Sequence, residues 1–260
     1  MNMLYLGLML GWLYLVNLAA GALLAKRVPV FALARAIVVA TGLLAMFFVE
    51  HLRGFDDLRL AYPLLFVIAC IILIKNQTDV WLWVKNDAAF FLGFAWAFFW
   101  RWSDPNIHTG TEHITDMFFI ANYAQGGTLP PPNLWMAPTV FDCYYAFQHY
   151  AAALLARIFD IGPGYAYNLA FPLVFAYAAS LVWQTTAYHT RSKTYAWVLT
   201  FAVLMGASGV IPFIEWLRTP QFNDWPIIAS MRFIGSAELR TSIAPFFAGG
   251  GREIMSYPLE

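Results

Sequence analysis

The chain has 260 residues, of which 61% are hydrophobic and 12% are charged, and its formal net charge is zero. That composition excludes an ordinary soluble domain, in which about a quarter of the residues are charged. The sequence contains no basic run, so it does not indicate a nucleic-acid-binding surface. Its apolar residues come in runs long enough to cross a bilayer, and we predict an all-α, multi-pass membrane protein.

About seven transmembrane helices are predicted from these runs. They lie at residues 3–24, 30–49, 60–74, 80–100, 140–158, 165–187 and 195–214. Lys85, Asn86 and Asp87 interrupt the fourth run, and Asp142, Gln148 and His149 lie within the fifth. Residues 1–100 and 140–214 are therefore predicted to be the membrane-embedded parts of the chain.

The first run is predicted to be a retained helix, because Lys26 and Arg27 follow it and no basic residue precedes it. This polarity puts the amino terminus outside. In that orientation, loops 51–59 and 101–139 lie outside and Arg157 lies on the cytoplasmic side.

Residues 101–139 form the longest polar interruption and are predicted to be an external loop that carries a surface helix. Thr109 and Glu112 match a capping box at the start of a helical run to Gln125, and Gly126 and Gly127 can end it. One apolar stripe recurs at helical spacing, which is typical of an amphipathic helix at a membrane surface. It consists of Ile114, Met117, Phe118 and Ala121.

Three acids of this loop are the candidate catalytic residues. Glu112 and Asp116 are four apart, so on a helix both could act in acid–base chemistry or hold a divalent cation. Alternatively, Glu112 is a capping residue and Asp116 lies on a solvated face. Asp104 could be a base just outside the bilayer, or an N-cap before Pro105.

The histidines give no clear metal signal. His108 and His113 are five apart and do not share a helix face, so solvated polar residues are the favoured interpretation, and no metal site is predicted. His149 lies in an apolar run and needs a partner. A hydrogen bond across helices is favoured over ligation of a cofactor such as a porphyrin.

Aromatic and acidic residues follow the three prolines: Trp135, Asp142, Tyr144 and Tyr145. They could form a membrane-interface belt or bind a sugar. Residues 215–260 mix aromatic residues with arginines and are predicted to be an extramembrane or interfacial segment that is incomplete.

The order of several motifs resembles the uncharacterised YYY membrane-protein family, the DUF2298 group. The first motifs are Pro105, Thr111-Glu112, Asp116, Pro131-Pro132-x-x-Trp135 and Tyr144-Tyr145. The likeness continues through Ala166-Tyr167-Asn168-Leu169, Asp224-Trp225, Ser230-x-Arg232-x-Ile234 and Tyr257-Pro258. The stretch from Arg27 to Ile37 is similar to the first cytoplasmic turn of the family.

The family looks like a branch of the GT-C membrane glycosyltransferases, which use polyprenyl-phosphate-linked sugars and an essential acid in an external loop. The resemblance implies that Glu112 and Asp116 are the matching acids and that Asp104 is a neighbouring loop acid. It also implies a divalent cation in an active enzyme. The expected partners are membrane lipids, a polyprenyl-phosphate sugar and other membrane subunits, in a bacterial or archaeal plasma membrane.

Departures from the family pattern keep a second hypothesis open. Where the family has Pro-Pro-x-Asp-Pro-Trp, this chain has Asn133-Leu134-Trp135, and where it has a tyrosine triplet, this chain has Asp142-Cys143-Tyr144-Tyr145. An Asp-Leu-His-Pro-His block is also absent, so the chain is expected to be truncated or reduced. The alternative function is a non-catalytic subunit of a larger membrane complex, for example an energy-converting or photosynthetic one. A transporter is less favoured, because few ionisable residues lie in the predicted spans.

Overall fold

The computed structural model describes residues 3–103, 105, 112–136, 138–142 and 147–205. Within these ranges the regular structure is helical, apart from two isolated β-bridges, and the predicted all-α class is confirmed. The chain forms two compact units. The amino-terminal unit comprises residues 2–85 and 107–170, and the carboxy-terminal unit comprises residues 86–106 and 171–260 together with Met1.

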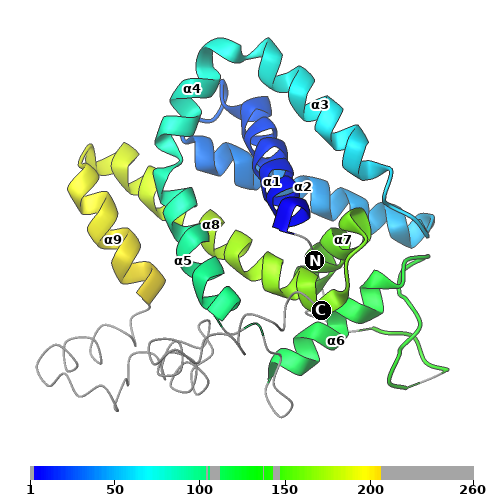
Figure 1. Ribbon diagram of the computed structural model, residues 1–260. Helices are drawn as coiled ribbons and strands as arrows, with labels where there is room; N and C mark the ends of the chain where they lie inside the picture. The colour runs from blue at the N-terminus through cyan, green and yellow to red at the C-terminus, as the bar shows by residue number, and fades with distance from the viewer. Residues whose placement is uncertain (1–2, 104, 106–111, 137, 143–146, 206–260) are drawn as a thin grey trace, which may run out of the picture. The chain divides into compact units, whose positions relative to one another are not determined.

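Four helices build the first part of the amino-terminal unit (Figure 1). They are α1 (Met3–Leu24), α2 (Phe31–Leu52), α3 (Ala61–Lys75) and α4 (Gln77–Asn86), the last without its final residue. α1 packs on both α2 and α3. The rings of Trp12 and Tyr62 stack at 5.3 Å, and the Trp12 indole donates a 2.8 Å hydrogen bond to the Tyr62 carbonyl. Apolar contacts and one satisfied polar group thus join α1 to α3.

The second part of the amino-terminal unit contains α6 (Glu112–Ala124), α7 (Phe147–Phe159) and the first turns of α8 (Pro163–Thr190). α6 packs along α7, and α7 also contacts α2 and α3. Aromatic side chains are buried between α6 and α7. Phe118, Phe119, Tyr123 and Tyr150 all belong to one core cluster. This cluster holds the segment after α6 against α7.

The carboxy-terminal unit contains α5 (Ala88–Ser103), the remainder of α8 and α9 (Lys193–Met205). Gly93 faces α8 so closely that a Cβ there would lie 2.7 Å from the Ala179 Cβ. Small residues allow such close helix contacts in membrane proteins. The buried Asp87 carboxylate accepts a 3.4 Å hydrogen bond from the Gln184 amide, so one predicted interruption of a span is satisfied within the protein.

Three described helices are long and apolar enough to cross a membrane, with spans at Leu4–Leu24, Phe31–Leu52 and Pro163–Thr190. α3 and α4 make a fourth only as one broken span, because they meet at an angle of 104°. That bend is visible where the two helices join in Figure 1. The seven predicted spans are not confirmed.

The predicted run at 140–158 shows why fewer spans are found than were predicted. Residues 140–142 are not helical, and α7 has 13 residues. A helix of that length extends about 20 Å, which is shorter than the hydrocarbon core of about 30 Å. The predicted run at 195–214 begins in α9, and its end lies outside the described residues, as does the predicted segment 215–260.

Candidate functional site

The predicted loop helix is present as α6, and its predicted end is confirmed. Gly126 and Gly127 have φ angles of 78° and 86°, in the left-handed region that glycine adopts without a steric penalty. The Gly126 amide donates to the carbonyl of Tyr123 over 3.4 Å. Thr109 of the predicted capping box lies outside the described residues.

α6 is covered on more than the one predicted stripe. Phe118, Phe119, Ile120 and Tyr123 are buried, and Asn122 between them has no exposed surface. The Asn122 side chain donates to the Phe118 carbonyl over 2.8 Å, and its Oδ1 accepts from the Leu134 amide over 2.9 Å. α6 is therefore fixed from two sides, by α7 and by the segment that follows the prolines.

The Asp116 carboxylate and the His149 imidazole meet between α6 and α7. Asp116 Oδ1 lies 3.0 Å from His149 Nε2, within hydrogen-bond distance. The His149 side chain is 6% exposed, whereas that of Asp116 is 36% exposed. The ring of Phe119 lies edge-on to the imidazole, with centroids 5.0 Å apart. The predicted hydrogen bond of His149 across helices is confirmed, and its partner is a candidate catalytic acid.

Trp135 lies on the outer surface of α6. Its ring stacks on Phe118 with centroids 3.6 Å apart and remains 61% exposed. Asn133 Oδ1 accepts hydrogen bonds from the amides of Trp135, at 2.9 Å, and Met136, at 3.2 Å. The amide oxygen of Asn133 thus stabilises the turn that presents Trp135.

Of the other predicted site residues, the structure describes Asp142 and the backbone of Glu112. Asp142 is exposed at the end of the segment after the prolines. Glu112 begins α6, but its side chain is not described, so its shared face with Asp116 stays a prediction. Asp104, Tyr144 and Tyr145 lie outside the described residues, as does His108.

Sequence reasoning missed a buried ionic cluster beside this site. The Glu50 carboxylate, at the end of α2, is fully buried and pairs with the Arg157 guanidinium of α7 at 2.8 and 3.0 Å. The Tyr150 hydroxyl also donates to Glu50 over 2.8 Å. Burial, followed by the interaction with Glu50, raises the pKa of the Tyr150 phenol, so the phenol stays a donor.

The contacts of Arg157 contradict one part of the predicted topology, its placement on the opposite side of the membrane from the loop after α2. The loop after α2 was predicted to lie outside and Arg157 to lie on the cytoplasmic side, yet Arg157 also donates to the Phe55 carbonyl in that loop. The prediction failed because it treated 140–158 as a complete span. Opposite charges at the ends of two apolar runs were the available signal, but they do not specify a pairing between distant segments.

The described residues do not by themselves supply a site for the divalent cation that the resemblance implied. Among the described residues, no group of three or more His, Cys, Asp or Glu side chains could hold a metal ion. Asp116 and His149 alone offer fewer ligands than protein sites for Zn²⁺, Ca²⁺ or Mg²⁺ supply.

The model of the family described as "Uncharacterized membrane protein (DUF2298)" matches residues 31–227, well over half of the chain. The chain belongs to this family. No curated protein and no solved structure gave a match. In this DUF2298 protein the matched region includes Asp116, Asn133, Trp135 and His149, and also the Glu50–Arg157 pair. Membership and the apolar helices identify an integral membrane protein.

Proposed function

We propose that this DUF2298 protein is a membrane glycosyltransferase that takes its sugar from a polyprenyl-phosphate-linked donor. The observation that carries the proposal is the contact between Asp116 and His149. A partly exposed carboxylate backed by a buried imidazole has the geometry of a general base that a second group holds in place. The resemblance to GT-C enzymes, which use a loop acid, gives the reaction class.

In the proposed reaction, Asp116 accepts the proton of an acceptor hydroxyl as the hydroxyl oxygen attacks C1 of the sugar. The bond between C1 and the phosphate oxygen breaks, and polyprenyl phosphate leaves with that electron pair. The Nε2–H of His149 donates to the Asp116 carboxylate and holds it in one orientation, while the proton of the acceptor hydroxyl stays on Asp116. Such positioned bases accelerate reactions by roughly 10²–10⁴-fold.

Trp135 supports a sugar substrate. Its ring is fixed on one side by Phe118 and exposed on the other. A flat apolar face of this kind can cover the C–H face of a sugar ring while the hydroxyls remain in water. Asp142 contributes an exposed carboxylate that can accept hydrogen bonds from hydroxyls.

Release of polyprenyl phosphate tests the proposal without knowledge of the acceptor. The purified protein would be incubated in detergent with membrane extract as acceptor and a panel of polyprenyl-phosphate hexoses and pentoses. We expect release with at least one donor and a loss of about 100-fold or more in Asp116→Asn, the scale of a general base. Asp79→Asn is the matched control, because Asp79 lies in the first turn of α4.

Two results would overturn the proposal. One is equal release by the wild-type protein and Asp116→Asn. The other is no release with any donor, together with copurification of a stoichiometric membrane subunit in mild detergent, which is the result that the accessory-subunit hypothesis predicts.

A further inference from the structure

Helix α4 turns away from α3 and is too short to cross a bilayer. The two helices meet at 104°, and the 10 residues of α4 extend about 15 Å. α4 packs across the last turns of α1, because Trp83 belongs to one buried cluster with Leu18, Ala22 and Phe31. Ala22 and Leu18 lie about 3 and 9 Å from the end of α1 along its axis. Helices that lie in a membrane surface are buried to a similar depth, about 5–10 Å.

The two faces of α4 differ in what they contact. Val80 and Trp83 pack on the buried cluster, and the Trp83 ring stacks on the ring of Phe31. Trp81 and Leu82 lie on the other face and are 64% and 58% exposed. The Lys85 ammonium lies 5.2 Å from the centre of the Trp81 ring. An exposed aromatic and aliphatic pair with a lysine beside it is typical of a helix at a membrane surface.

This end of the amino-terminal unit carries an excess of positive charge. Its exposed cations are Lys26 and Arg27 after α1, Lys75 at the end of α3, and Lys85. Asp79 is the one acid in residues 14–31 and 72–85, so four cations and one acid give these segments a net charge of +3. Within the described part of the chain, no carboxylate forms an ion pair with any of the four cations.

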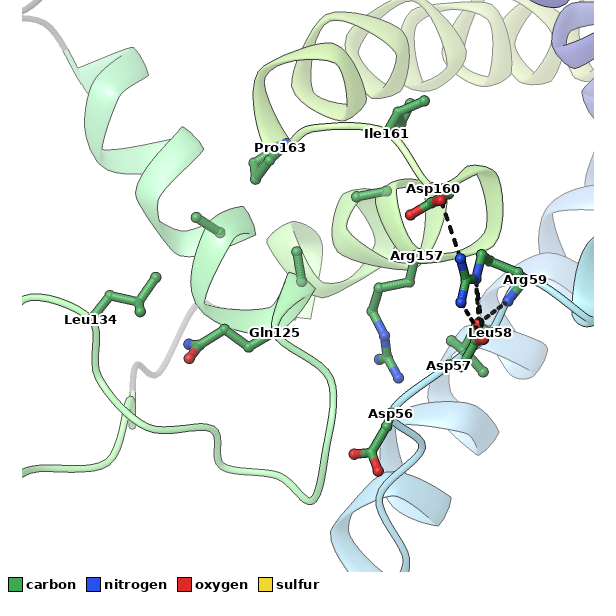
Figure 2. Close-up of a pocket in the computed structure, with 13 residues that line it drawn as sticks. Asp56, Asp57, Leu58, Arg59, Gln125, Leu134, Arg157, Asp160, Ile161 and Pro163 are labelled. Atoms are coloured by element: carbon green, nitrogen blue, oxygen red, sulfur yellow. Dashed lines mark hydrogen bonds and ion pairs between the residues drawn. The ribbon is translucent and has the colours of Figure 1, made fainter.

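The opposite end of α2 does not share this excess. The 22 residues of α2 separate the two ends by about 33 Å. At the far end, Arg59 pairs with Asp57 at 2.9 Å and with Asp160 at 3.5 Å, as Figure 2 shows. Arg53 and Asp56 are the other charged residues of that loop. Two cations thus meet three acids there, and only the α4 end attracts an anionic surface.

We propose that α4 lies in the membrane surface and binds anionic phospholipids. Trp81 and Leu82 contact acyl chains just below the headgroups, and each cation contacts the phosphodiester of a neighbouring lipid. The stem of Lys85 crosses the Trp81 ring, which lets its ammonium reach the phosphates from that depth. A lipid surface is favoured over an acidic protein because a lipid supplies both the anionic group and the apolar cover, and this chain is an integral membrane protein.

The first experiment measures which lipids the full chain retains. The protein would be placed in nanodiscs with equal amounts of phosphatidylglycerol and phosphatidylcholine, transferred to an uncharged detergent and analysed by native mass spectrometry. We expect preferential retention of phosphatidylglycerol. Joint Lys75→Gln and Lys85→Gln should lower the preference about fivefold per lysine. Joint Lys75→Arg and Lys85→Arg should keep it, as should Arg53→Gln at the far end of α2. Thermal unfolding of each variant checks the fold.

The second experiment locates α4 relative to the bilayer. A spin label would be attached to Leu82→Cys in a full chain whose two native cysteines are replaced. Its collisions with oxygen, which concentrates in the bilayer, would be compared with its collisions with a water-soluble nickel complex. We expect a higher oxygen-to-nickel ratio than for a label at Asp57→Cys, which lies in the exposed loop after α2.

Five results would overturn the proposal. They are equal retention of the two lipids, an unchanged preference in the glutamine double variant, an equal loss in Arg53→Gln, a water-exposed label at position 82, and a stoichiometric protein that replaces lipid and is lost only in the glutamine double variant. None of these measurements involves polyprenyl phosphate release, so this proposal and the proposed glycosyl transfer can fail separately.

Discussion

Glu50 and Arg157 form a buried two-point ion pair that connects α2 to α7. Glu50 Oε1 lies 2.8 Å from Nη2 of Arg157, and Oε2 lies 3.0 Å from Nη1, across 107 positions of the sequence. Tyr150 donates to the same carboxylate one residue after His149. The pair therefore fixes the helix that carries the imidazole contacting Asp116.

Glu50→Gln should destabilise the protein strongly, because a neutral amide leaves the buried Arg157 guanidinium without a carboxylate to pair with. Breaking a buried pair in this way costs about 3–5 kcal/mol. Denaturant unfolding in detergent, followed by tryptophan fluorescence, measures the change. Asp57→Asn is the control, since it breaks the exposed pair with Arg59 and should change stability little. Equal losses of unfolding free energy in the two variants would contradict the claim that the buried pair stabilises the protein more than the exposed pair does.

Gly54→Ala should also be destabilising, for a steric reason. A Cβ at Gly54 would lie 2.1 Å from the carbonyl carbon of Gly127, where the loop after α2 meets the end of α6. Such overpacking typically costs about 1–3 kcal/mol. Gly42→Ala, within α2 and with nothing inside 4 Å, should instead stabilise by up to about 1 kcal/mol. Thermal unfolding of both variants would show opposite signs, and a shared sign would refute the close-approach argument.

Substitutions of Asn133 test the departure of this chain from the family pattern. Restoring the family acid with Asn133→Asp should preserve the turn, because a carboxylate oxygen can accept the same two amide bonds. Asn133→Ala removes the acceptor and should cost about 1 kcal/mol. The difference in iodide quenching between each variant and its Trp135→Phe counterpart isolates Trp135 among the eleven tryptophans and measures how accessible its ring is. Comparable quenching in the two variants would argue against this role of Asn133.

Local features of the fold were predictable from the sequence, whereas long-range pairings were not. The helix over Glu112–Ala124 and its glycine end follow from patterns within a few residues. The need of His149 for a partner follows from its apolar surroundings. The partner itself, Asp116, is 33 positions away, and no local pattern identifies it. The length of α7 was missed because hydrophobicity continues into residues that are not helical.

The pairing of Asp57 with Arg59 predicts how the Asp57 carboxyl titrates. Hydrogen bonds from Arg59 lower the pKa of Asp57 below 3.8. Because the folded-state pKa is depressed, any stabilisation by the pair is present at neutral pH and is lost as pH falls through that lowered value. Titration of ¹³C-carboxyl aspartate should show Asp57 with a midpoint below 3.8, and Arg59→Gln should raise it. A midpoint that does not respond to Arg59→Gln would contradict the pairing.

The most direct test of the central claim is a double-mutant comparison of Asp116 and His149. Polyprenyl phosphate release would be measured for the wild type, Asp116→Asn, His149→Gln and the double variant, with unfolding checked for each. If the pair acts as one base, the double variant should be no slower than Asp116→Asn, because groups that work as a unit are not additive. Additive losses, or wild-type release by Asp116→Asn, would contradict a shared catalytic role.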